Sequence, residues 1–371
     1  MENAVAAKDV AYEPDGRFYL DEAVIEALPG EFGSVSAEAC GISAWTTTGK
    51  ITTKRLDGSK KLFFLKTAYG EAGGVILKGE FESAKAIHLL MPSLIPEPIS
   101  YGSYKRLTPL TYFYLSEFVK MDVSATPDPV QLANKLSELH KRSRSPTNKF
   151  GFHVTTCDGK MPNTVVWEES WATFFGNLLR AICKIDQQNN GSWPEMDAAT
   201  ERVINSVVPR LLRNLKHEGN PIEPCLLHGD LWEPNLGVNL ENGKLIMYDV
   251  SSFYAHNEME MGLWRADFCS HLRSPIYKEQ YLLKYPAAEP VDEFDDRNRL
   301  YSLKASLNYS AGHPESAVRQ SAYNNMCYLC EKYSTTEGIG KYDPQKDPSV
   351  TGAAFVPDFG KRDEVTEEKA A

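Results

Sequence analysis

Residues 226–260 read LLHGDLWEPNLGVNLENGKLIMYDVSSFYAHNEME, and the pattern in this stretch decides the fold. It contains the motif HGD at residues 228–230, and Asn235 follows five residues after the Asp of that motif. Two short β-prone runs, LGVNL and KLIMYD, flank Asn242-Gly243. An Asn-Gly pair between such runs predicts a β-hairpin. The hairpin would bring Asp249 back beside Asn235.

The spacing of these oxygen-bearing side chains suits phosphoryl transfer to a hydroxyl group. An Asp on a loop can orient the attacking hydroxyl and accept its proton, which makes Asp230 the candidate catalytic residue. A following Asn and a second Asp after a hairpin can hold Mg²⁺ against nucleotide phosphates, because a hard cation takes oxygen ligands. We therefore expect Asn235 and Asp249 to be metal ligands, and ATP and Mg²⁺ to be the cofactors.

The first third of the chain has strand character. Two β-prone runs, at residues 41–55 and 61–67, flank Asp57-Gly58, and this arrangement predicts another hairpin. Apolar residues at helical spacing follow over residues 78–91, and a further strand is expected over residues 111–119. Such a β-rich segment can supply the nucleotide-binding part of a kinase.

Four residues of this segment are candidates for binding the nucleotide. Lys66 ends the strand run FFLK, where a kinase has its phosphate-binding lysine. Glu80, in the predicted helix, can pair with Lys66, and Glu82 is a competing partner. Side chains two residues apart on a helix face different ways, so only one of the two can form the pair. Glu117 and Val119 lie where a hinge would offer backbone groups to adenine.

Past residue 120 the pattern becomes helical. Asp128 and Pro129 form a helix-start signature, as N-cap and first helical residue. Further helices are expected over residues 169–185, 194–215 (bent near Pro209), 296–308 and 315–333. We therefore predict an N-terminal nucleotide-binding lobe at residues 1–120, a C-terminal catalytic and substrate lobe at 121–340, and a flexible or surface-draped tail at 341–371.

Composition narrows the class of protein. The 371 residues are 42% hydrophobic, which is typical of an ordered globular chain. The formal net charge of −10 argues against a general nucleic-acid binder. The apolar runs are too short for a membrane span, and residues 1–16 are not expected to be a secretory or mitochondrial signal, because they lack a basic region followed by an apolar core. We expect a cytoplasmic protein with reduced thiols and with neither nucleic acid nor membrane as a partner.

Four segments resemble the fructosamine/ketosamine-3-kinase family, relatives of aminoglycoside phosphotransferases within the protein-kinase-like fold. The segments are KFGFHVTTCDGKMPN (149–163), WEESWATFF (167–175), LHGDLWEPN (227–235) and YDVSSFYAH (248–256). The resemblance implies an α+β, two-lobed protein-kinase-like fold. It also implies ATP-dependent phosphorylation of the sugar 3-hydroxyl of a ketosamine, such as a fructosamine or ribulosamine adduct, either as a small molecule or linked to a protein.

The resemblance also carries residue roles. It makes Asp230 the catalytic base, Asn235 and Asp249 the Mg²⁺ ligands, and Lys66 with Glu80 the nucleotide pair. It places Trp232 beside the substrate, where an indole face can pack against a sugar ring. His256 is expected to line or brace the substrate pocket.

The chain departs from the family pattern next to these residues. Glu233-Pro234 stands where the family usually has small residues with Gly, and Asp249 is followed by Val-Ser-Ser-Phe. These changes leave two alternatives open: a kinase for a different small-molecule or specialised-metabolite acceptor, and a non-catalytic nucleotide-binding protein. Cys40 lies where the nucleotide loop is expected, so its oxidation could control ATP binding.

Overall fold

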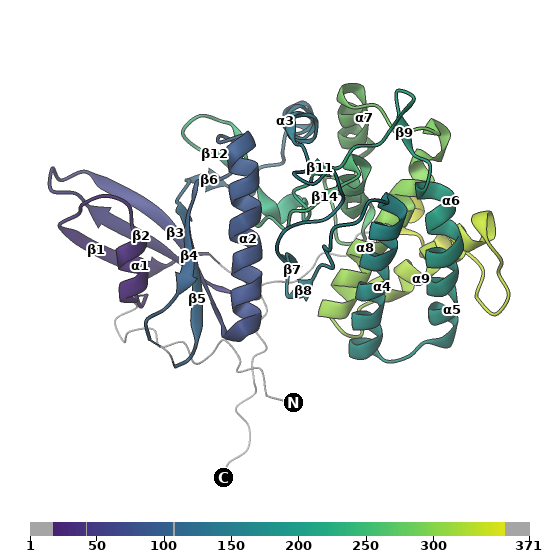
Figure 1. Cartoon of the computed structure of the whole chain (residues 1–371), viewed down its shortest axis with the longest axis horizontal. Helices are drawn as coiled ribbons and strands as arrows, with labels where there is room; N and C mark the ends of the chain where they lie inside the picture. Colours follow the sequence, from purple (N-terminus) through teal and green to yellow (C-terminus); the bar gives the residue numbers. More distant parts are fainter. Residues whose placement is uncertain (1–17, 42, 107, 353–371) are drawn as a thin grey trace, which may run out of the picture.

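The computed structural model describes residues 18–41, 43–106 and 108–352, and these form two lobes (Figure 1). The smaller lobe contains an antiparallel sheet in the order β1-β2-β3-β5-β4. Its elements are α1 (Glu22–Ala27), β1 (Ser34–Ala39), β2 (Thr47–Lys54), β3 (Lys60–Tyr69), α2 (Gly70–Leu90), β4 (Pro98–Ser103) and β5 (Thr111–Glu117). The predicted α+β architecture of two lobes is confirmed.

The larger lobe is mainly helical. Its α-helices are α3 (Pro129–Arg142), α4 (Trp171–Asn190), α5 (Pro194–Arg202), α6 (Val208–Leu212), α7 (Pro275–Lys284), α8 (Phe294–Gly312), α9 (Val318–Tyr333) and α10 (Pro348–Thr351). Its short strands are β6 (Met121–Asp122), β7 (Cys157–Asp158), β8 (Met161–Pro162), β9 (Lys216–His217), β10 (Asn220–Pro221), β11 (Cys225–Leu226), β12 (Leu236–Asn239), β13 (Leu245–Met247) and β14 (Tyr254–Ala255). Among the described residues, no helix is both long and apolar enough to cross a membrane.

Both hairpins predicted from turn residues are present. Strands β2 and β3 pair around Asp57-Gly58, and strands β12 and β13 pair around Asn242-Gly243. Gly58 and Gly243 have φ values of +84° and +67°, in the left-handed region that glycine adopts without strain. The turns therefore set the registers from local sequence alone.

Helix α2 begins at Gly70, earlier than the predicted start at residue 78, because glycines disguise its first turns. These glycines allow close packing. A Cβ atom on Gly74 would lie 2.8 Å from the Tyr112 ring, and one on Gly79 would lie 2.6 Å from the carbonyl oxygen of Thr155 in the larger lobe. The sequence shows that glycine has a low helix propensity. It does not show that these positions have no room for a side chain.

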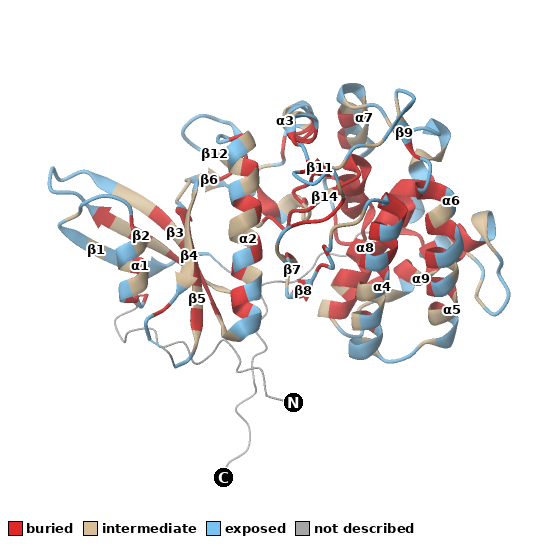
Figure 2. Cartoon of the chain, in the orientation of Figure 1, coloured by how far each residue is buried: buried red, intermediate tan, exposed pale blue. Residues whose placement is uncertain are grey.

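The helices of the larger lobe begin close to the predicted positions. The carboxylate of Asp128 caps α3 by accepting a hydrogen bond from the Gln131 N–H at 2.7 Å, as expected. The predicted bend near Pro209 coincides with a π-helical segment, Val203–Val207, immediately before that residue. Helix α8 is buried along nearly its whole length and runs through the centre of the lobe (Figure 2).

Residues 341–352 lie against the larger lobe. The Asp347 carboxylate accepts a hydrogen bond from Arg299 at 2.5 Å, and the Asp343 N–H donates to the Asn324 side chain at 2.8 Å. The remainder of the predicted tail, 353–371, lies outside the described residues, as do residues 1–17. The boundaries proposed for the two lobes and the tail remain predictions.

A fully buried ion pair joins α8 to the segment that follows β14. Arg297 donates to Glu258 through Nε at 2.7 Å and Nη2 at 3.0 Å, and both side chains are 0% exposed. Arg297 also donates to the carbonyl oxygens of Ala288 and Pro290, and Glu258 accepts from the Ala288 N–H. Neither charge can be removed without leaving the other buried and unmatched.

We therefore expect Glu258→Ala to lower the free energy of unfolding by about 3–5 kcal/mol, because Arg297 would remain as an uncompensated buried charge. Glu201, which pairs with Arg180 on the surface at 2.7 Å, provides the control. Glu201→Ala should cost less than about 1 kcal/mol, because solvent screens that pair. Urea denaturation measures both, and equal losses for the two variants would contradict the expectation.

Candidate active site

A cavity of about 440 Å³ is lined by side chains of both lobes. The smaller lobe contributes Lys66 and Glu80, and the larger lobe contributes Asp230, Asn235 and Asp249. Six of the nine sequence-predicted site residues line this cavity, namely these five and Trp232. The structure brings together the five that were expected to act on the nucleotide phosphates and the attacking hydroxyl.

The HGD loop is held from beneath by a buried carboxylate. Glu260, 3% exposed, accepts hydrogen bonds from the backbone N–H groups of His228 at 2.6 Å and Gly229 at 3.0 Å. Burial alone would raise the pKa of Glu260, but the His140 side chain and then the hydrogen bond from the Gly229 N–H outweigh it and lower the pKa. Glu260 is consequently ionised and fixes the backbone that carries Asp230.

His228 braces the same loop and does not line the cavity. Its Nε2 donates to the carbonyl oxygen of Tyr248 at 3.0 Å, and its Nδ1 accepts from the Asp230 N–H at 3.3 Å. Burial lowers the pKa of the His228 imidazole. One donating and one accepting nitrogen describe a neutral ring, so His228 links the Asp230 loop to the strand that precedes Asp249.

Gly229 is required by the close approach of a second backbone segment. Its φ is +87°, and a Cβ atom there would lie 2.0 Å from the carbonyl oxygen of Ser251. The Ser251 N–H in turn donates to the carbonyl oxygen of His228 at 2.9 Å. The absence of a side chain at Gly229 therefore sets the separation between the Asp230 loop and the Asp249 segment.

The β12–β13 hairpin places Asp249 beside Asn235, as the sequence predicted. The Tyr248 N–H donates to the carbonyl oxygen of Asn235 at 3.1 Å. The Asn235 Nδ2 donates to the Asp230 backbone oxygen at 2.8 Å and to its Oδ2 at 3.0 Å. Asp249 has a φ of +55°, a sparsely populated conformation of the kind that occurs at functional sites.

Burial changes the acidity of Asp230. Burial first, and then the negative charge of Asp158, raise its pKa well above that of an ordinary carboxyl group. The Lys304 ammonium and the Asn235 hydrogen bond act in the opposite direction. Lys304 is itself paired with Asp158, at 2.6 Å. This environment makes Asp230 more basic than an exposed carboxylate, which favours proton acceptance.

Lys66 pairs with Glu80, and the alternative partner Glu82 is excluded. Lys66 Nζ lies 2.8 Å from Glu80 Oε1 and also bonds Asp249, whereas Glu82 faces His153 at 3.3 Å. Burial lowers the pKa of Lys66, but the charges of Asp249 and Glu80 outweigh it and raise the pKa above its usual value. Burial raises the pKa of Glu80 to about 7, although Lys66 opposes this.

The side chains present fit a hard divalent cation. Asp249 offers a carboxylate, and Asn235 offers an amide oxygen because its Nδ2 is already engaged with Asp230. All three side chains line the same cavity. Oxygen donors of this kind are what Mg²⁺ takes, usually together with waters and substrate phosphates.

The predicted hinge residues lie at the end of β5 and do not line the cavity that contains Asp230. The Glu117 N–H donates a hydrogen bond to the Glu97 carbonyl oxygen at 2.9 Å. An adenine contact would therefore have to use other backbone groups of Glu117 and Val119, and this role stays a prediction.

Cys40 follows β1, and its N–H donates to the Thr48 carbonyl oxygen at 3.1 Å. Its proposed redox role also stays a prediction.

Trp232 lines the cavity as expected, at one end of a series of aromatic rings. Its ring meets the Phe268 ring edge-on at 5.4 Å, and Phe268 stacks on Tyr309 at 4.6 Å. Tyr309 stacks on His313 at 4.1 Å, and His313 meets Trp45 edge-on at 6.2 Å. This aromatic wall, formed by Trp232, Phe268, Tyr309, His313 and Trp45, borders the cavity on the side expected to receive the acceptor.

The prediction for His256 as a substrate residue is corrected by the structure. His256 is 1% exposed, lies outside the cavity lining, and its Nδ1 is 2.9 Å from the Tyr301 hydroxyl. Its ring also contacts Trp171 edge-on. Burial, and then the Arg297 charge, lower its pKa well below that of ordinary histidine. His256 is thus a neutral core residue, and its position after the Asp249 segment does not bring it to the surface of the pocket.

The Glu233-Pro234 departure has a structural role. The Glu233 carboxylate accepts hydrogen bonds from the backbone N–H groups of Ser270 and Leu272, each at 2.8 Å. Pro234 lies in the first turn of a 3-10 helix, Glu233–Asn235, where its missing N–H costs little. These two residues therefore anchor the segment near Phe268, which belongs to the aromatic wall.

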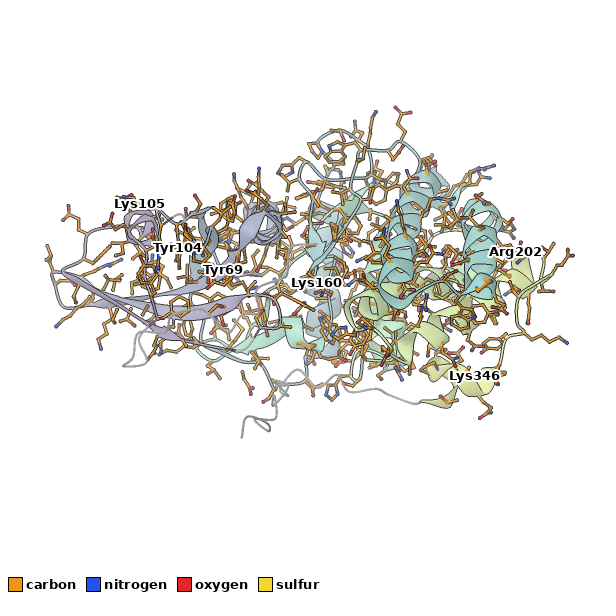
Figure 3. The ribbon with its side chains drawn as sticks, turned by 90° about the horizontal axis from the view of Figure 1, so that it is seen from below. Tyr69, Tyr104, Lys105, Lys160, Arg202 and Lys346 are labelled. Carbon is orange, nitrogen blue, oxygen red and sulfur yellow. The ribbon has the colours of Figure 1, made fainter. Side chains whose placement is uncertain are left out.

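Sequence reasoning missed three features that shape the site. Glu260 lies within a stretch without helical or strand periodicity, so its contact with the HGD loop had no local signal. Trp45 lies in the loop between β1 and β2, and Lys160 Nζ lies 4.9 Å from its ring centroid (Figure 3 shows Lys160 where the lobes meet). The Asp158–Lys304 pair joins residues far apart in the chain.

We expect Gly229→Ala to destabilise the protein more than Gly58→Ala. The two glycines have nearly equal φ values, but a Cβ atom on Gly58 meets open space. Gly58→Ala should cost about 1 kcal/mol for backbone strain, and Gly229→Ala a further 1–3 kcal/mol or so, because Ser251 must move. Chemical denaturation measures the difference. Equal effects would show that the contact with Ser251 is not tight.

Comparisons with known proteins agree with this geometry. Residues 38–326 match the family model "Fructosamine kinase". A relative from Oryza sativa subsp. japonica, named protein-ribulosamine 3-kinase, chloroplastic, is 30% identical over 69% of this chain and 70% of its own length. Among solved structures, a putative fructosamine-3-kinase from Thermobifida fusca has a TM-score of 0.63 at 16% identity, covering 81% of this chain and 94% of that one.

An aminoglycoside phosphotransferase mutant, solved in a ternary complex with AMP-PNP and hygromycin B, has a TM-score of 0.52 at 13% identity. The match covers 84% of this chain and 96% of that one. At such identities the solved structures establish the protein-kinase-like fold alone. The family model covers far more than half of the sequence, and the chain therefore belongs to the fructosamine kinase family.

Proposed function

We propose that the protein transfers the γ-phosphoryl group of ATP to the 3-hydroxyl of a ketosamine. The observation that supports this most directly is the convergence of Asp230, Asn235, Asp249 and the Lys66–Glu80 pair on one cavity. The family assignment and the name of the rice relative support the ketosamine as the acceptor class, either free or linked to a protein. The kinase-like neighbour that holds AMP-PNP supports ATP as the nucleotide.

Each residue of the site would have a distinct task. Asp230 would orient the acceptor hydroxyl and accept its proton, with its carboxylate held in place by Asn235 at 3.0 Å. Lys66, placed by Glu80, would bind the nucleotide phosphates. Mg²⁺, when held by Asn235 and Asp249, would neutralise charge that develops on the transferred group. Trp232 would pack against the sugar.

We expect Asp230→Asn to lower kcat with a ketosamine acceptor by about 10²–10⁴-fold, the usual contribution of a general base. Binding of Mg²⁺-ATP should be retained, because Asp230 acts on the acceptor. Asp57→Asn, an exposed change in the β2–β3 turn, is the control and should leave the rate unchanged. Coupled ADP-release kinetics and nucleotide titration measure both quantities. Near wild-type turnover of Asp230→Asn would rule out the mechanism.

The pH profile offers an independent check on Asp230. Activity requires the ionised carboxylate, so it is lost as pH falls through the Asp230 pKa. Asp158 raises that pKa and Lys304 lowers it. Asp158→Asn should therefore move the acid limb of kcat/KM to lower pH, and Lys304→Met should move it to higher pH. Shifts in the same direction for the two variants would contradict this assignment.

The acceptor class can be tested with a panel of fructosamines, ribulosamines, free ketoses and unrelated hydroxyl compounds. We expect transfer to the ketosamines, with phosphate located on the 3-hydroxyl by NMR. Transfer only to an unrelated hydroxyl compound would favour the alternative of a different acceptor. Failure to bind Mg²⁺-ATP would favour a non-catalytic role. Cytoplasmic location also stays a proposal, since the rice relative is named chloroplastic.

A further inference from the structure

Asn308 of α8 lines the cavity and has one side-chain atom without a partner. The residue is 9% exposed, and its Nδ2 donates to the backbone oxygen of Asp158 at 3.2 Å. Its Oδ1 is buried and has no hydrogen-bond partner among the described residues. Because Nδ2 already faces an acceptor, the hydrogen bonding fixes the orientation of the amide. Oδ1 is then left as an acceptor that a bound donor would satisfy.

The surroundings of Asn308 favour a cationic donor. Tyr309, next to it in sequence, stacks between Phe268 and His313, so aromatic faces border this part of the cavity. Such faces attract an ammonium group. Two lysines of the larger lobe lie near the cavity. Lys304 is matched by Asp158 at 2.6 Å, and Lys160 has its Nζ 4.9 Å from the ring centroid of Trp45, at the other end of the aromatic wall from Trp232. At Asn308 itself, an anionic group would meet the acceptor Oδ1 and no hydrogen-bond donor.

We propose that Asn308 determines specificity for amine-linked acceptors. Its Oδ1 accepts a hydrogen bond from the protonated amine nitrogen of the ketosamine, while the aromatic wall stabilises the charge of that nitrogen. This inference rests on the proposed function and deepens it. A free ketose has a neutral hydroxyl in place of this nitrogen, so it could donate to Oδ1 but would lack the charge that strengthens the hydrogen bond and that the aromatic faces stabilise. A site with a buried acceptor discriminates strongly against a ligand that leaves that acceptor unpaired.

The test compares two ligands that differ in one atom. The first is an N-alkyl 1-amino-1-deoxyfructose, and the second is its analogue with carbon in place of nitrogen. Calorimetric titration of the full chain with Mg²⁺-ADP present gives both affinities without requiring turnover. We expect the wild type to favour the amine by about tenfold or more, and Asn308→Leu to remove that preference while binding of the carbon analogue changes little.

Asn298→Leu provides a matched control. Asn298 is also a buried asparagine of α8 whose Nδ2 donates to a backbone oxygen, that of Met261 at 2.8 Å, but it does not line the cavity. This variant should lose stability and keep the amine preference. Thermal unfolding checks each protein, and Asn308→Ser, whose shorter side chain cannot replace Oδ1, gives the same comparison if the leucine variant fails to fold.

Equal affinity of the wild type for the two ligands would overturn the proposal, as would equal losses on both ligands in the Asn308 variants. A different result would refute the proposed function. A wild type that prefers the amine but transfers no phosphate to it would refute the ketosamine kinase assignment and leave the Asn308 assignment supported.

Discussion

The hydrogen bonds that the Glu260 carboxylate accepts from the backbone N–H groups of His228 and Gly229 are the constraint on which the site depends. They satisfy two N–H groups of a buried, irregular loop that neither a helix nor a sheet could satisfy. The loop is then fixed against the Ser251 backbone, which approaches Gly229 more closely than any side chain would allow. As a result, the segments that carry Asp230 and Asp249 form one rigid unit, although nineteen residues separate the two carboxylates in sequence.

The features that could be predicted from sequence were those encoded by short-range chemistry. Asn242-Gly243 and Asp57-Gly58 specify their hairpins through local backbone preferences, and the first of these hairpins places Asp249 beside Asn235. The sequence predicted that Lys66 pairs with only one glutamate of the helix, because side chains two apart point in different directions. The structure identifies that partner as Glu80, whereas Glu82 faces His153. In each case, a few neighbouring residues and one regular backbone geometry were enough to predict the contact.

The features that could not be predicted depend on tertiary packing. Glu260 acts through the backbone of a loop more than thirty residues earlier, and no local pattern distinguishes it from the neighbouring Glu258, which binds Arg297. His256 follows the motif that carries Asp249, yet the chain turns it into the core against Tyr301. The early start of α2 was hidden by Gly73 and Gly74, which pack closely against Ala68 and Tyr112 of the same lobe. The spacing of residues in the sequence does not reveal any of these contacts.

Trp45 connects the two lobes at the cavity. Its loop belongs to the lobe that carries Lys66, but its indole contacts His313 and lies under the Lys160 ammonium in the other lobe. Any displacement of that loop would therefore also change the wall that the larger lobe gives to the cavity. The position of one lobe relative to the other and the shape of the cavity are linked through a single ring.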